Sequence, residues 1–225
     1  YGPYALTLNF PNPIDRLHRK TGYGIWLHGA GNDERIQEKT TTEGCVAFYN
    51  DEIVKLKEWL RPLHSVIVIS DNSGFVNKKE DVRLLRKTFD SWLQSWRNRN
   101  LQEYTNHYHQ DFKMRQMNKK AFSSYKGRVF NSYKKMVVDV EQIRVITHAK
   151  YAVTFFNQDF YGDNRFTSRG RKVLYWLKDK NGDWKIARED FSKSKFKAFE
   201  FTPSHVASIQ KVDASKSFEA KEVPL

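Results

Sequence analysis

The residues best suited to covalent chemistry are one cysteine and one histidine in the first quarter of the chain. Cys45, the sole cysteine among 225 residues, follows His28 by 17 positions. A thiol has a reference pKa near 8.5, so a nucleophilic cysteine needs a nearby imidazole or helix N-terminus that favours the thiolate. The sequence offers both, because His28 ends an expected strand and an expected helix begins shortly after Cys45. This pattern indicates a cysteine nucleophile with a histidine base.

Gly44, directly before Cys45, favours acyl transfer as the reaction. Without a Cβ it lets a carbonyl substrate approach the backbone, where the amides of Gly44 and Cys45 can stabilise an oxyanion. Spacing alone favours a buried cysteine in a turn and a histidine that closes a strand, since local signatures do not transfer between families. One cysteine forms no internal disulfide, so the redox compartment stays open.

The elements expected around these residues belong to a small sheet with short helices. Asn50 is expected to cap the following helix by accepting hydrogen bonds from first-turn amides. Aromatic and branched residues predict the strands, and Pro62 ends the second helix. The expected elements are strands at Ala5–Phe10, Tyr23–Leu27 and Ser65–Ser70, a helical turn at Ile14–Arg19 and a helix at Asp51–Leu60.

The rest of the chain predicts helices followed by strands, which is typical of an α+β domain. A 3.6-residue stripe predicts that one face of a helix over Lys79–Arg99 is buried; its members are Val82, Leu85, Phe89, Trp92, Leu93 and Trp96. Asn181 and Gly182 predict a tight hairpin turn, and the SRGRK cluster at Ser168–Lys172 is expected to be a solvated strand start. The further expected elements are helices at Leu101–His107 and Lys119–Lys134 and strands at Met136–Thr147, Tyr151–Phe160, Arg171–Lys178 and Trp184–Glu189.

Composition and charge restrict the class of protein. The 39% hydrophobic and 15% aromatic residues are typical of a soluble folded protein, and no stretch approaches the roughly 18 apolar residues of a membrane helix. A net charge of +13 favours anionic partners, but no nucleic-acid recognition motif accompanies it. His107, His109 and Asp111 could suggest a metal, yet such a pattern is common by chance, so we expect neither metal nor cofactor.

The first part of the chain resembles a known family. A strand ending in His28–Gly29, a spacer, the TTEGC segment and a helix starting near Asn50 resemble the YkuD-type LD-transpeptidases, whose motif is His-Gly followed by Ser/Thr-x-Gly-Cys. The resemblance covers roughly residues 1–70, including YGPYALTLNFPN. It implies that Cys45 is the nucleophile, that His28 is the general base oriented by the Gly29 carbonyl, and that the Gly44 and Cys45 amides form the oxyanion hole.

Two departures from this family bear on the reaction. Crosslinking members usually carry His and Arg where this chain has Glu43 and Ala47, and with Thr42 these positions are expected to lie near the substrate. The sequence is more similar to a branch in helical bacteria that trims the terminal D-Ala from peptidoglycan tetrapeptides and thereby influences cell shape. An LD-carboxypeptidase is therefore expected; LD-transpeptidation and a non-catalytic peptidoglycan-binding role are the alternatives.

The family's catalytic domain normally has more strands before this point. We therefore expect that residues 1–70 cannot close their sheet unaided and that the chain is a processed or trimmed segment, or is completed by another chain. The start, YGPYALTLNF, lacks the pattern of a secretory signal, which is expected to have preceded it in a periplasmic protein.

The second part, roughly Lys79–Phe191, resembles the nuclear transport factor 2-like (NTF2-like) fold, a cone of helices and a curved sheet around a cavity. The resemblance rests on DSWLQSWRNRNLQEYTNHYHQDF and GDWKIARED. It implies a pocket for a peptidoglycan stem peptide or glycan, with Tyr125, Arg128, Tyr151, Tyr161 and Arg171 as candidate contacts. The expected organisation is a partial catalytic domain at 1–75, the pocket domain at 76–191 and a tail at 192–225; the oligomeric state stays open.

Overall fold

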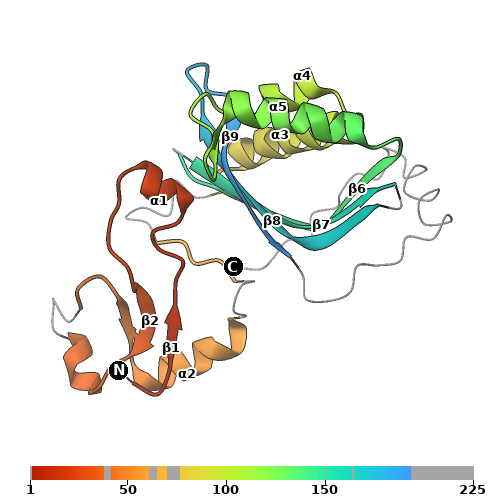
Figure 1. Ribbon diagram of the computed structural model, residues 1–225. Coiled ribbons are helices and arrows are strands. Elements are labelled where there is room, and N and C mark those ends of the chain that lie inside the picture. The colour runs from red at the N-terminus through yellow and green to blue at the C-terminus, as the bar shows by residue number, and fades with distance from the viewer. Residues whose placement is uncertain are drawn as a thin grey trace. The chain divides into compact units, whose positions relative to one another are not determined.

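The computed structural model describes residues 2–37, 42–60, 65–69, 77–149, 151–163 and 165–193. The chain divides into two compact units, Tyr1–Gly74 and Phe75–Leu225 (Figure 1). The first unit is mixed, with short strands and short helices, and the second has longer helices and a long curved sheet.

The N-terminal unit is built on a three-stranded sheet in the order β1-β2-β3. Its strands are β1 (Ala5–Thr7), β2 (Trp26–Gly29) and β3 (Val46–Phe48), and its helices are α1 (Pro13–Leu17), the 3-10 helix η1 (Asp33–Gln37) and α2 (Asn50–Trp59). β1 is antiparallel to β2, whereas β3 is parallel to β2. The parallel pair matters for the site, because it fixes the segment around Cys45 beside the segment around His28.

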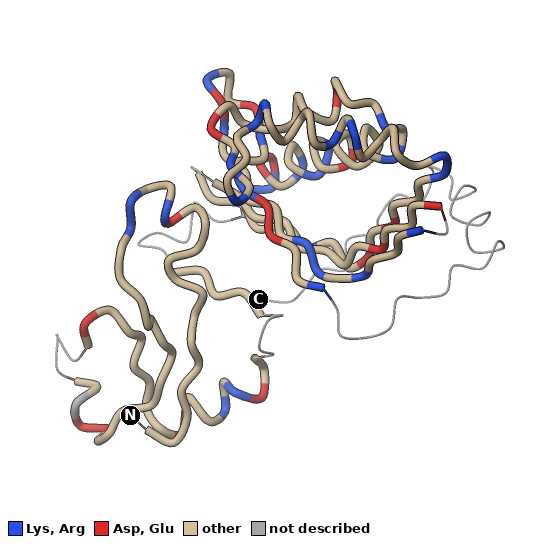
Figure 2. The backbone as a smooth tube through the Cα atoms, in the orientation of Figure 1, with Lys and Arg blue, Asp and Glu red and all other residues tan. Residues whose placement is uncertain are grey.

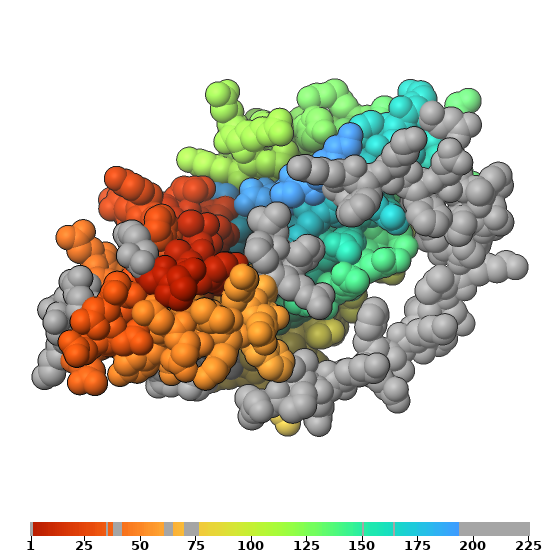
Figure 3. All heavy atoms as spheres, turned by 90° about the horizontal axis from the view of Figure 1, so that it is seen from below, coloured from red at the N-terminus to blue at the C-terminus, as the bar shows by residue number. Residues whose placement is uncertain are grey.

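α1 is capped at its start, and α2 contacts the N-terminal segment near its end. At α1, the Asn12 side chain accepts the amides of Ile14 and Asp15, and the Asp15 carboxylate accepts the Asn12 amide, a complete capping box. At the far end of α2, Lys57 Nζ lies 4.6 Å from the centroid of the Tyr4 ring. Figure 3 accordingly shows the first residues, in dark red, lying against α2, in orange.

The expected cap of α2 is wrong. Tyr49 occupies the N-cap position without a side-chain cap, and Asn50 is the first helical residue. The Asn50 amide donates to Asp33 Oδ1 at 3.0 Å, and its own side-chain oxygen is buried. A carboxylate from η1 therefore serves the positive end of this helix, a pairing between residues 17 apart that no local motif reveals.

Two strand expectations also change. A short strand, β3, lies between Cys45 and α2, where none was expected. Three residues give little local signal, and the strand is stabilised by its pairing with β2. The buried strand expected at Ser65–Ser70 is wrong for Ser65–Ile69, and Ser70 lies outside the described residues. No described strand pairs with Ser65–Ile69, and Val66, Val68 and Ile69 are 37%, 43% and 63% exposed.

The C-terminal unit has three helices on one face of a four-stranded antiparallel sheet, as Figure 1 shows. The helices are α3 (Lys79–Arg97), α4 (Leu101–Asn106) and α5 (Lys119–Ser132), and a two-stranded ribbon pairs β4 (Lys113–Met114) with β5 (Met117–Asn118). The sheet order is β6 (Met136–Thr147), β7 (Tyr151–Gly162), β8 (Phe166–Lys178) and β9 (Trp184–Lys193). The expected α+β class is confirmed.

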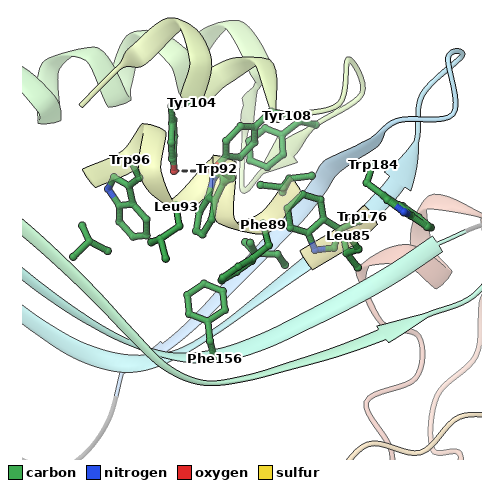
Figure 4. Packing of buried hydrophobic residues seen from close by; sticks show 14 of the residues in the cluster. Leu85, Phe89, Trp92, Leu93, Trp96, Tyr104, Tyr108, Phe156, Trp176 and Trp184 are labelled. Carbon is green, nitrogen blue, oxygen red and sulfur yellow. Dashed lines mark hydrogen bonds between the residues drawn. The ribbon is translucent and has the colours of Figure 1, made fainter. Parts of the chain in front are cut away.

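The core of this unit is aromatic. Five of the six stripe residues of α3 are buried, Val82 being the exception, and they pack toward the sheet (Figure 4). Phe156 points from the sheet to meet Phe89 and Trp92, with ring centroids 5.1 and 5.9 Å apart. Alternate residues of β7 are buried, which identifies the even-numbered positions as the face that the helices cover.

The strand β8 extends further than expected, and this overturns one expectation. Ser168 and Lys172, expected in a solvated strand start, are 9% and 5% exposed inside the strand. They share the even-numbered face with Leu174 and Trp176, so they point toward the helices. The expected hairpin between β8 and β9 is present, but its connection spans Asp179–Asp183 and Gly182 alone takes a positive φ, of +83°.

Candidate functional site

The parallel pairing of β2 and β3 brings His28, on β2, close to the segment that holds Cys45, directly before β3. Leu27 lies opposite Val46, and His28 lies opposite Ala47. Paired residues of a parallel sheet point to the same face, and side chains alternate along each strand. Cys45 lies one residue before β3, and extending the alternation of β3 by that residue places it on the same face as His28.

His28 is held in one orientation by the backbone. Its side chain is 7% exposed, and its Nδ1 lies 2.7 Å from the Gly29 carbonyl oxygen. A carbonyl oxygen only accepts hydrogen bonds, so in this contact Nδ1 carries the proton and Nε2 is the basic nitrogen. The same oxygen accepts the Gly2 amide at 2.9 Å, so the Gly29 carbonyl is itself held in place by the segment that leads into β1.

The loop that presents Cys45 is shaped by Thr42 and Gly44. The Thr42 hydroxyl donates to the Cys45 carbonyl at 2.6 Å, which closes the turn. Gly44 has φ +119°, a conformation that side-chain-bearing residues rarely adopt, and no described atom lies within 4 Å of the place of a Cβ. Cys45 Sγ is half-buried and donates to the Gly24 carbonyl at 3.4 Å.

Gly29 is required by close packing. A Cβ on Gly29 would lie 2.4 Å from Asn50 Oδ1 and 3.1 Å from Pro3 Cδ. A Cβ on Gly2 would lie 2.1 Å from the same Asn50 oxygen. The start of α2 therefore packs directly against the backbone that supplies the orienting carbonyl.

The remaining predicted contacts of this unit lie beside the dyad. Glu43 is exposed in the Cys45 loop, and Ala47 lies opposite His28 in the β2–β3 register. Neither position provides a cation. The candidates in the second unit are not brought together in its interior: Tyr125 and Arg128 are exposed on α5, while Tyr151, Tyr161 and Arg171 lie on the sheet face away from the helices. Arg171 packs there over the Phe155 ring at 5.2 Å.

The interior of the second unit instead contains a charged cluster that the sequence analysis missed. Lys172 Nζ lies 3.4 Å from Glu189 Oε2, and both side chains are 6% exposed. The Tyr108 hydroxyl donates to the same carboxylate at 3.2 Å and is hydrogen-bonded to the Tyr104 hydroxyl at 2.6 Å. Lys126, 9% exposed, lies over the Tyr104 ring at 5.2 Å. We call Lys126, Lys172, Glu189, Tyr104 and Tyr108 the buried charged cluster.

The electrostatics of this cluster favour an added negative charge. Two lysines face one carboxylate, and burial with the nearby Lys172 charge lowers the pKa of Lys126 to about 8. Burial and the Glu189 charge raise the pKa values of both tyrosines. Trp96, whose ring lies 5.0 Å from both lysine ammonium groups, has a buried indole N–H with no hydrogen-bond partner among the described residues. An anion here would meet one donor, the Trp96 indole N–H, that the described residues leave unused.

Periodicity could have revealed the buried lysines. Lys126 lies four residues after Phe122 and four before Phe130, both buried, so it belongs to the inward stripe of α5. Lys172 alternates with Leu174 and Trp176 in β8. The residue type suggested solvent, whereas the position indicated the interior.

The histidines considered for a metal have other partners. His107 Nε2 lies 3.3 Å from the Ser91 hydroxyl, and the Asp111 amide donates to His109 Nδ1 at 3.1 Å. Burial and the Lys185 charge lower the pKa of His107 to about 4. Within the described ranges, no group of three His, Cys, Asp or Glu residues could hold a metal ion.

The expected pair, His28 on β2 and Cys45 directly before β3, together with a helix-covered antiparallel sheet, is typical of an LD-transpeptidase-type catalytic unit followed by an NTF2-like domain. The L,D-transpeptidase catalytic domain family (YkuD) matches residues 2–69, and the Cds6 C-terminal NTF2-like domain family matches residues 84–190. The chain belongs to the LD-transpeptidase family of peptidoglycan enzymes, among members with this second domain, and the family acts in the cell envelope.

Solved structures share both units. Bd1075 of Bdellovibrio bacteriovorus is 30% identical with a TM-score of 0.73, over 85% of this chain and 70% of its own. Pgp2 of Campylobacter jejuni, described as a helical cell shape determining protein, is 26% identical with a TM-score of 0.61, over 84% and 68%; its K307A mutant gives 25% and 0.65. A search of curated proteins found no match. None of the described helices is long and apolar enough to cross a membrane.

Proposed function

We propose that this protein is a periplasmic LD-carboxypeptidase that removes the terminal D-Ala from tetrapeptide stems of peptidoglycan. The observation that carries the proposal is the backbone-fixed imidazole: Nδ1 of His28 donates to the Gly29 carbonyl, 2.7 Å away, on the strand paired with β3, which Cys45 directly precedes. This arrangement leaves Nε2 as the base for the thiol.

The reaction follows from the groups present. Nε2 of His28 takes the Cys45 proton, and Sγ attacks the diaminopimelate carbonyl that precedes D-Ala. The resulting oxyanion accepts hydrogen bonds from the Gly44 and Cys45 amides. The C–N bond breaks as His28 returns the proton to the departing D-Ala amine. A water molecule deprotonated by His28 then attacks the thioester carbonyl, and the C–S bond breaks as His28 returns that proton to the Cys45 sulfur.

Two positions support water, not a second stem peptide, as the acceptor of the acyl group. Glu43 and Ala47 stand where crosslinking members of the family usually have cations, and Ala47 lies directly opposite His28. Loss of these cations removes groups that could bind a second substrate's carboxylate. Pgp2, which shares both domains, is described as determining helical cell shape, and an influence on cell shape is part of this proposal.

The NTF2-like fold of the second unit supports a second contact with the same polymer, whose stem peptides carry free carboxylates. Figure 2 shows that lysines and arginines occur along the described backbone of both units.

Purified tetrapeptide muropeptides test the proposal. The wild-type chain should release D-Ala and leave tripeptides, whereas Cys45→Ala and His28→Gln should do neither. As a matched control, Trp59→Ala changes an 82% exposed aromatic residue of α2 and should trim normally. Unchanged tetrapeptide with the wild type would refute the assignment, dimers joined between diaminopimelates would indicate transpeptidation, and binding to sacculi without turnover would indicate a non-catalytic role.

A further inference from the structure

The segment before β2 lies at the nucleophile, although no expected site residue belongs to it. Cys45 Sγ donates to the carbonyl of Gly24 at 3.4 Å. This contact places the Gly24 carbonyl beside the sulfur to which a substrate carbonyl carbon would bond. The residue next to it in the chain, Tyr23, is 93% exposed, which leaves its ring available to a ligand.

The residues on both sides of Tyr23 are glycines with positive φ. Gly22 and Gly24 have φ values of +104° and +72°, which favour glycine at both positions. The place of a Cβ on Gly22 has one close neighbour, Phe10 at 3.9 Å, and that on Gly24 has Trp26 Nε1 at 3.8 Å, so packing leaves room at both. Backbone conformation, not crowding, accounts for the two glycines.

The thiol contact has a chemical consequence. While Cys45 is protonated, the Gly24 oxygen accepts its hydrogen. Once His28 removes that proton, two acceptors face one another and the contact becomes repulsive. A substrate amide N–H beside the reacting carbonyl can replace the lost donor, and peptide stems carry such a group on the residue that supplies the carbonyl.

We infer that Tyr23 is a substrate-contact residue: its ring packs on the stem peptide while the adjacent Gly24 carbonyl accepts an N–H from the same peptide. The inference rests on the proposed acyl transfer at Cys45. It assigns substrate recognition, not chemistry, to the segment between Gly22 and Gly24. The ring supplies the contact, so phenylalanine should replace tyrosine.

Steady-state trimming of a tetrapeptide muropeptide by full-chain variants tests this inference. Tyr23→Ala should raise KM about tenfold with kcat within about twofold of wild type, because the lost contact exists in the ground state as well as the transition state. Tyr23→Phe and the exposed-ring control Trp59→Ala should retain wild-type KM. An unchanged KM for Tyr23→Ala, a loss confined to kcat, or an equal loss in Tyr23→Phe or Trp59→Ala would overturn it.

Failure of the proposed function would be distinguishable. If the wild-type chain trims no substrate, the proposed reaction is wrong, and the contact is judged by binding alone. Tetrapeptide binding to Cys45→Ala is then compared with binding to the Cys45→Ala/Tyr23→Ala double variant. About tenfold weaker binding by the double variant supports the Tyr23 contact, and equal binding overturns it.

Discussion

Replacing Gly29 by alanine is the sharpest test of how the imidazole is held. The new methyl group would lie 2.4 Å from Asn50 Oδ1, 3.1 Å from Pro3 Cδ and 3.2 Å from Gly2 Cα, so both β1's approach and the start of α2 must move. Overpacking of this kind costs about 1–3 kcal/mol. For a unit of this size, about 2 kcal/mol corresponds to a Tm lower by about 10 °C.

The same displacement should weaken catalysis. The Gly29 carbonyl moves with its residue, and it is the acceptor 2.7 Å from His28 Nδ1. Small misplacements of catalytic groups can cost up to about a hundredfold in rate. We expect kcat to fall at least about tenfold, measured well below the Tm of the variant.

Gly31→Ala is the matched control, since no described atom lies within 4 Å of its would-be Cβ. Calorimetry should show an unchanged transition for Gly31→Ala and a lowered one for Gly29→Ala, while the transition of the other unit stays constant. Equal melting and equal kcat for the two variants would refute the proposed link between α2, the Gly29 carbonyl and His28.

Four further perturbations test separate features. Gly44→Ala should lower kcat by more than about tenfold in the muropeptide assay, because φ +119° strains any L side chain at the oxyanion hole; wild-type turnover would contradict this. Asp33→Ala should cost about 1 kcal/mol in denaturant unfolding through loss of the acceptor at the start of α2, and an unchanged midpoint would count against that role. The pKa of Lys126 is lowered from 10.5 to about 8, so between these pH values the unfolded chain binds more protons than the folded chain. The free energy of unfolding should therefore rise by about 3 kcal/mol from pH 8 to 10.5, and Lys126→Met should flatten this rise. The pKa of His107, lowered from 6.5 to about 4, should make stability fall as pH drops from 6.5 to 4, and His107→Gln should lose less over that range; identical acid profiles would argue against it.

Local sequence signals predicted the second unit well. The stripe on α3 and the alternation along the strands are both repeated over many residues, so helix, strand and buried face follow from period alone. The buried charged cluster was missed for a related reason. Lys126 and Lys172 occupy inward positions in these patterns, but lysine is a residue type that is mostly exposed, so residue type and position disagree.

The first unit was harder to predict because its elements depend on contacts between distant segments. β3 is three residues long and exists through its pairing with β2. Asparagine commonly caps helices, but the free amide at the start of α2 is accepted by Asp33 and not by the side chain of Asn50. The positions of His28 and Cys45 were recognisable from their motif, whereas the packing of Gly29 against Asn50 had no signal in the local sequence.

The parallel register of β2 and β3 implies that turnover should not depend on the length of the loop between these strands. Because His28 lies opposite Ala47, strand pairing sets the position of His28 relative to the segment that holds Cys45. The length of the loop between the two strands does not determine that position. We expect residues inserted after Gly31 to leave turnover intact, whereas one residue inserted between Cys45 and Val46 would turn the thiol to the opposite face. Searches for distant relatives should therefore keep the two strand motifs fixed and allow the spacer between them to vary.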